Sequence, residues 1–172
     1  MFALLLVAVF LVAGMGFVSA ACEDGRVGFW KFDEGAGTTA IDSSGSGFDG
    51  TLEGSTASWV SGKVGGALEF SGTGRVNVGN SQVLRPDSEM SLEFLIKTTN
   101  PGFNSGVSVP FSRHWYGYAD PWWAQRLTFG GGKFSFGYVG GSKGAVSQNS
   151  NVDDGVWHHI VVLHDGSKLK IY

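Results

Sequence analysis

The sequence has very little cysteine, because Cys22 is the single cysteine among 172 residues. No disulfide can form within the chain, so a hydrophobic core has to hold the fold. Basic residues are also few. Lys and Arg number 12 against 15 Asp and Glu and form no cluster, so no nucleic-acid partner is expected. After Gly25, no window spaces apolar residues at 3.6 over three turns, which predicts almost no helix.

The first 21 residues contain no charged side chain. Leu4–Phe10 is apolar and Val18–Ala20 is small, which predicts a signal peptide over residues 1–20 and a secreted or cell-surface protein. Two alternatives stay open. The apolar stretch is long enough for an uncleaved membrane anchor. Ser19–Cys22 also loosely matches a lipoprotein cleavage site, in which Cys22 would carry the lipid.

Glycine is abundant, at 28 residues, about double its usual share. These glycines, with Asn, Asp and Ser, separate short runs rich in β-branched and aromatic residues, which is the pattern of an antiparallel all-β fold. The expected strands are Val27–Phe32, Ala67–Phe70, Val76–Val78, Met90–Thr98, Val107–Phe111, Arg126–Phe129, Lys133–Tyr138, Trp157–His164 and Lys168–Tyr172.

Turn residues and apolar runs predict how these strands are arranged. Gly130–Gly132 and Asp165–Ser167 suit tight hairpin turns, so the strands on either side of each should be antiparallel neighbours. Phe94–Ile96 and Ile160–Leu163 are apolar without alternation, as expected of central strands covered on both faces. We therefore expect residues 26–172 to form one antiparallel β-sandwich of two sheets.

The last residues, Lys168–Tyr172, alternate polar and apolar like a strand in progress, and no turn or polar tail follows. Either an edge strand is left bare, which invites aggregation, or the polypeptide is incomplete. We expect the sandwich to be incomplete at its C-terminus.

Three motif blocks follow one another along the chain. They are GFWKFDEGAGT at 28–38 with DSSG at 42–45 and DGT at 49–51, GKVGGALEFSG at 62–72, and DGVWHHI at 154–160 with DGS at 165–167. In this order they resemble the laminin-G-like, concanavalin A-like lectin domains. The resemblance implies a two-sheet jelly roll used in secreted adhesive and carbohydrate-binding modules, often attached to larger surface proteins or hydrolases. It does not imply one ligand. Family members usually continue past the position of Tyr172, and residues 103–125 match nothing in the pattern.

The segment from His114 to Trp123 is unusually aromatic. Flat rings stack on the apolar faces of sugars while nearby polar groups bind the hydroxyls, so this segment is the predicted carbohydrate-binding surface. Two alternatives are that it covers the sandwich core or packs against a neighbouring domain. The candidate ligand-binding residues are Arg113, Trp115, Tyr118, Trp122 and Trp123.

An acidic, oxygen-rich turn from Asp42 to Asp49 could hold a structural calcium ion, with these two aspartates as side-chain ligands. Such stretches also form ordinary turns without a metal. Elsewhere, Trp30 and Phe32 share a face and are expected in the core, as is Trp157.

Two further sets of residues invite a chemical role. His158 and His159 are neighbours on a predicted strand, so they point to opposite faces and a structural role is expected. Glu89 and Glu93 could serve a glycoside hydrolase, but four strand residues separate their Cα atoms by about 13 Å. We therefore predict a non-catalytic binding module for carbohydrate or another surface polymer. The alternatives are a structural or protein-docking domain of a larger surface protein and, less favoured, a glycoside hydrolase.

Overall fold

The computed structural model describes residues 25–54, 56–71, 73–84, 89–99, 108–113, 124–130, 133–139, 144–146, 152–165 and 167–172. Over these ranges the fold is all-β with antiparallel pairing throughout, as predicted, and one 3-10 turn, η1 (Gln82–Leu84), joins its two halves. None of the residues so described belongs to a helix that is long and apolar enough to cross a membrane.

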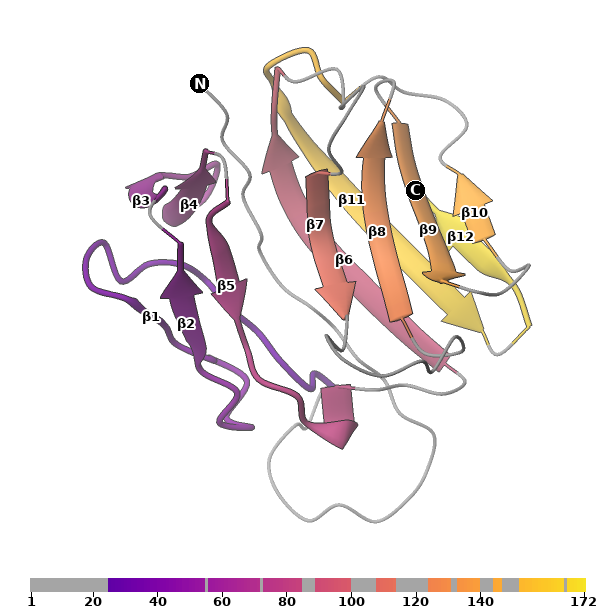
Figure 1. Cartoon of the computed structure of the whole chain (residues 1–172), viewed down its shortest axis with the longest axis horizontal. Coiled ribbons are helices and arrows are strands. Elements are labelled where there is room, and N and C mark those ends of the chain that lie inside the picture. Colours follow the sequence, from indigo (N-terminus) through magenta and orange to yellow (C-terminus); the bar gives the residue numbers. More distant parts are fainter. Residues whose placement is uncertain are drawn as a thin grey trace.

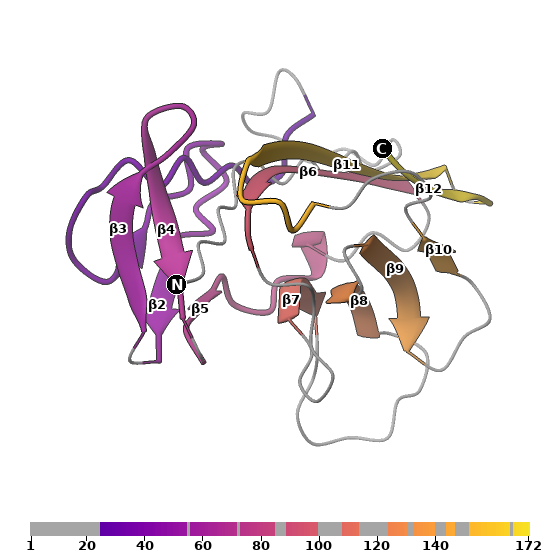
Figure 2. The ribbon, with the colours of Figure 1, turned by 90° about the horizontal axis from the view of Figure 1, so that it is seen from above.

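Two sheets of the C-terminal half lie face to face in Figure 2. One has the order β12-β11-β6 and the other the order β10-β9-β8-β7. Their strands are β6 (Glu89–Lys97), β7 (Ser108–Arg113), β8 (Ala124–Gly130), β9 (Lys133–Val139), β10 (Gly144–Val146), β11 (Trp157–Asp165) and β12 (Leu169–Ile171). This stacking is the predicted sandwich.

The N-terminal half lies beside the sandwich (Figure 1, indigo to magenta). It contains a sheet of order β1-β2-β5 and a separate hairpin of β3 with β4. Its strands are β1 (Thr39–Ala40), β2 (Gly50–Glu53), β3 (Ala57–Ser61), β4 (Gly66–Phe70) and β5 (Arg75–Asn77). One continuous apolar cluster joins the two halves, because Trp30, Phe32 and Leu68 belong to the same core as Phe94 and Val162.

In the sandwich the core lies on the inner face of β6 and β11, where every second residue is buried along β6 and from Ile160 onward along β11. Phe94 and Val162 are fully buried, and such side chains each contribute about 1.5–3 kcal/mol of hydrophobic free energy. The outer face differs from the prediction that both faces would be covered. Leu163 is 37% exposed and Leu95 is half-buried, so in the described structure the apolar runs alternate between a buried and a partly open face. β11 is central as predicted, whereas β6 ends its sheet.

The predicted strand Val27–Phe32 does not form. Its backbone makes one isolated bridge, from Trp30 to Asp42, because Phe32 has a φ of 59° and the amide of Phe29 binds a side chain instead of a neighbouring strand. The predicted core positions are nevertheless confirmed, since Trp30 and Phe32 are 4% and 3% exposed. The Trp30 indole N–H also donates to the carbonyl of Phe48 at 2.8 Å.

The other eight predicted strands form, with ends that differ by a few residues, and both predicted hairpins are confirmed. Gly130 pairs with Lys133 at the β8–β9 turn, and His164 pairs with Leu169 beside the β11–β12 turn. Four strands were not predicted: β1, β2, β3 and β10. They are short and rich in Gly, Ala, Ser and Thr, so their pairing partners and not their composition hold them extended.

Candidate functional site

The Asp42 carboxylate is a hub that accepts three backbone amides. Oδ1 accepts the N–H groups of Phe29 and Ser44, each at 2.9 Å, and Oδ2 accepts that of Phe48 at 3.0 Å. The Asp42 amide in turn donates to Oδ1 of Asp49 at 2.8 Å. Since Asp42 is only 7% exposed, this carboxylate ties the extended segment before β1 to the 42–49 turn.

Two opposing effects set the pKa of Asp42. Burial raises the pKa, while the hydrogen bonds from Ser44, Phe29 and Phe48 lower it, and the net pKa lies below the ordinary value. The carboxylate therefore stays charged at neutral pH and holds its donors as an anion.

The hydrogen bonds of this turn bear on whether a calcium ion fits there. Amide N–H groups already point at both oxygens of Asp42, so the anion is neutralised by dipoles of the chain itself. Within the described residues, no group of three or more His, Cys, Asp or Glu side chains is arranged to hold a metal ion. The arrangement in the structure is that of a hydrogen-bonded turn, and calcium at Asp42 and Asp49 stays a prediction.

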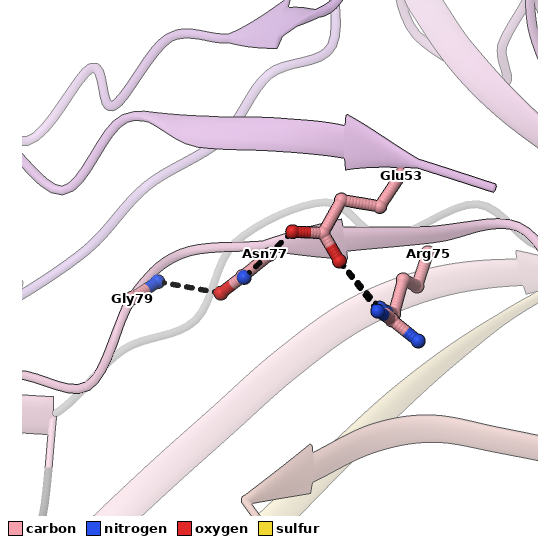
Figure 3. Close-up of polar contacts among 4 residues, drawn as sticks. All are labelled: Glu53, Arg75, Asn77 and Gly79. Carbon is pink, nitrogen blue, oxygen red and sulfur yellow. Dashed lines mark hydrogen bonds and ion pairs between the residues drawn. The ribbon is translucent and has the colours of Figure 1, made fainter.

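A second polar group lies on the exposed face of the β2–β5 pair, where Glu53 bonds to Arg75 and Asn77 (Figure 3). The Glu53 carboxylate accepts from Nη2 and Nε of Arg75 at 2.6 and 2.7 Å and from Nδ2 of Asn77 at 2.8 Å. Hydrogen bonds from Asn77 and then Arg75 lower the pKa of Glu53. Because Arg75 is 72% exposed, this pairing joins the strands and adds little stability.

The adjacent histidines have different partners. His158 Nε2 lies 2.9 Å from Oδ1 of Asp154, and His159 Nε2 lies 2.6 Å from Oε1 of Glu93. They stand on opposite faces of β11, as expected for neighbours in a strand, and each ring serves to join a turn or a strand to β11.

The two glutamates considered for hydrolysis are not brought together. β6 pairs with β11 residue by residue from Glu89 to Lys97, without a bulge that would shorten the distance between Glu89 and Glu93. Retaining hydrolases hold their carboxyl groups about 5–5.5 Å apart and inverting ones about 6.5–9.5 Å. Glu93 is instead bonded to His159.

A cleft of about 230 Å³ separates the β3–β4 hairpin from one end of the sandwich. Trp157, the first residue of β11, stands on the sandwich side. It is half-buried and lies outside the core cluster, so the prediction that it anchors the core is wrong. The cleft is lined by Val60, Ser61, Ala67, Leu68, Glu69, Lys97, Thr98, Thr99 and Trp157.

The predicted ligand-binding residues fall almost entirely outside the described part of the chain. Trp115, Tyr118, Trp122 and Trp123 lie there, and of Arg113 only the backbone is described, at the end of β7 opposite Gln125 of β8. Their role in binding stays a prediction. The cleft at Trp157 was not predicted, because its walls are far apart in the sequence. The sequence signal at its edge is Trp157 itself, a tryptophan two residues after Gly155.

Comparison with known families decides the classification. The family model described as the concanavalin A-like lectin/glucanases superfamily, of the laminin-G type, matches residues 70–172. The chain belongs to this superfamily. The match includes the third block of the laminin-G-like resemblance and the last residues of the second block, at 70–72. The first block precedes the match. No curated protein and no solved structure matches the chain.

Membership in the laminin-G-like group describes this protein at the level of a class. Domains of the group bind carbohydrates or proteins, are typically non-catalytic and are usually extracellular. The scaffold does not supply the ligand, because the residues of a site and not the fold set its specificity.

Proposed function

We propose that this laminin-G-like domain is a non-catalytic carbohydrate-binding module of a secreted or cell-surface protein. The proposal combines the binding class of the family with the aromatic segment between β7 and β8. Rings of this kind stack on the apolar faces of sugars, while Arg113 supplies donors to hydroxyl groups.

One observation carries the proposal. Arg113 at the end of β7 pairs with Gln125 near the start of β8, so the segment 114–123 leaves and re-enters the four-stranded sheet at the same end. Paired strands thus hold both ends of a segment that contains three tryptophans and two tyrosines. Ligand-contacting segments are commonly supported in this way, on a rigid sheet whose core does not depend on them.

The carboxylate geometry supports binding over hydrolysis. Glu89 and Glu93 are spaced along one straight strand, and Glu93 is occupied by His159. Glu89 and Glu93 are the two residues considered above as the acid and the nucleophile of a glycoside hydrolase.

The test is retention of the purified protein in polysaccharide-containing gels and binding on a glycan array. Wild-type protein should be retarded, and the double variant Trp122→Ala, Trp123→Ala should lose most of that retardation, because stacking is removed. Tyr172→Ala is the control, since it removes an aromatic ring that is 65% exposed and far from the segment in sequence. Equal retardation of the double variant and wild type would exclude the segment as the site.

A protein-docking or structural role is the second candidate, and the outer face of the β6–β11–β12 sheet favours it. Leu163 and Tyr172 are exposed there and Leu95 and Val161 are half-buried, so this face carries large apolar side chains beside the bonded pair of Glu93 and His159. A neighbouring domain of the same protein would cover it. Tight binding of such a domain without any glycan response would select this alternative.

A further inference from the structure

Trp157 forms one wall of the cleft, and a tight turn directly before β11 fixes its position. Gly155 has a φ of 77°, its amide donates to the carbonyl of Thr98 at 2.9 Å, and an added Cβ would meet Cγ2 of Thr99 at 3.0 Å. Asp154 accepts the amide of Val156 at 3.0 Å. The turn is thus bonded to the residue that follows β6 through Thr98 and to β11 through His158, so the backbone of Trp157 is held in place before any ligand arrives.

The opposite wall comes from the β3–β4 hairpin. Ala67 and Glu69 are two residues apart on β4 and so lie on one face, with the buried Ala67 forming an apolar floor. Lys97 pairs directly with Trp157 across β6 and β11, which places these two side chains on the same face. An aromatic ring, a carboxylate and an ammonium group therefore surround one small space.

The two charged side chains of the cleft are not engaged in ion pairs within the described part of the chain. Among the described residues, Glu69 and Lys97 have no ion-pair or side-chain hydrogen-bond partner, in contrast to Glu53, Glu93 and Asp154. A half-buried carboxylate and an ammonium group without partners can each bind a ligand hydroxyl without first breaking a bond within the protein.

We propose that this cleft is a second binding site, which takes one neutral pyranose residue of a glycan. The apolar face of the sugar ring stacks on Trp157, one hydroxyl donates to the Glu69 carboxylate and another accepts from Lys97. Because the Glu69 carboxylate and the Lys97 ammonium group have opposite charges, the cleft has no net charge and gives neither a uronate nor an amino sugar an electrostatic advantage over a neutral sugar.

The size of the cleft sets how much of a glycan enters. At about 230 Å³ it is smaller than the roughly 300–1,000 Å³ pockets of drug-sized ligands, which matches one ring and not an extended chain. The inference shares its ligand class with the proposed function, but it uses none of the residues of the aromatic segment. The two can therefore fail separately.

The experiment titrates the purified protein with methyl β-glucopyranoside and methyl β-galactopyranoside, followed by saturation-transfer NMR and by the indole N–H signal of Trp157. Glucuronate and glucosamine are the charged comparisons. At least one neutral glycoside should bind and shift the Trp157 signal, and neither charged sugar should bind more tightly than that glycoside. Glu69→Gln and Lys97→Met should each weaken the neutral glycoside about tenfold, the value of one charge-assisted hydrogen bond.

The controls separate a binding effect from a folding effect. Glu89→Gln and Lys168→Met remove the same charges from exposed positions at the opposite end of β11 from Trp157 and should leave the affinity unchanged. Trp157→Phe keeps a ring in the half-buried position and should weaken binding without unfolding the protein. Absence of binding by both neutral glycosides, or equal affinity in wild type, Glu69→Gln and Lys97→Met, overturns the inference. If polysaccharide retention persists in that case, the proposed function stands and the cleft alone is rejected.

Discussion

Replacing Asp42 with alanine removes the common acceptor of the amides of Phe29, Ser44 and Phe48. Each bond to a charged acceptor in a partly buried place contributes about 1 kcal/mol net, because water can recover some of the loss. Three such bonds give an expected loss of about 3 kcal/mol in the free energy of unfolding. This is a large share of the roughly 5–15 kcal/mol that a domain has in total.

Asparagine at the same position should have an intermediate effect. Its single carbonyl oxygen can keep the two donors that Oδ1 holds, but its NH₂ group then faces the amide of Phe48, donor against donor. We expect a loss of about 1.5 kcal/mol. Asp49→Asn is the matched control, because exposed Asp49 accepts one amide through one oxygen, which asparagine also provides. Its loss should be below about 0.5 kcal/mol.

Urea unfolding followed by tryptophan fluorescence measures all three variants at neutral pH. The order of stability should be wild type, Asp49→Asn, Asp42→Asn and Asp42→Ala. Equal stability of Asp42→Ala and wild type would show that the amides do not depend on this carboxylate. A loss in Asp49→Asn as large as that in Asp42→Ala would show that the turn is held by the acidic pair and not by the Asp42 hub.

The same carboxylate should act on the pH dependence of stability. Since the pKa of Asp42 is lower in the folded state, its contribution is complete above the unfolded value of about 3.9 and is lost as pH falls through the folded pKa. Wild-type protein should lose stability more steeply than Asp42→Asn below about pH 4. Parallel curves for the two proteins would contradict the cause given for the pKa shift.

Two further predictions concern acidic side chains in turns. Backbone hydrogen bonds from Lys168 and then Ser167 lower the pKa of Asp165 to about 2, and a carboxyl ¹³C titration should find that value. The Asp165 carboxylate should therefore stabilise the β11–β12 turn until the pH falls toward 2. An ordinary pKa would contradict the turn geometry. Calcium, predicted from the sequence at Asp42 and Asp49, should raise the Tm of wild type relative to EDTA and should not raise that of Asp49→Asn; an identical Tm in both buffers would remove the calcium prediction.

Much of the sandwich could be predicted from composition and alternation. β6, β9 and β11 are rich in aromatic and aliphatic residues, and glycine or aspartate marks their turns. Short polar strands such as β2 and β3 could not be found in this way, because their extended form depends on the strands beside them. The prediction that both faces of β6 would be covered was also wrong. A run of apolar residues does not reveal what packs against each face of a strand.

The candidate sites divide along the same line. The aromatic segment after Arg113 could be recognised as unusual from residue types alone, and the acidic turn at Asp42 likewise. Whether Asp42 meets a cation or amide groups depends on where Phe29 and Phe48 lie, which no local pattern records. The lining of the cleft at Trp157 could not be predicted from the sequence, because Glu69 and Lys97 reach it from different strands.

By itself the sequence determined the all-β class, the laminin-G-like family, the two hairpins and the burial of Trp30 and Phe32, because these follow from local residue types, their spacing and ordered motifs. Only the tertiary structure decided which amides the Asp42 carboxylate accepts, which face of β6 is buried and which charges face Trp157. Contacts between residues distant along the chain depend on how sheets stack, and a one-dimensional pattern does not contain that information.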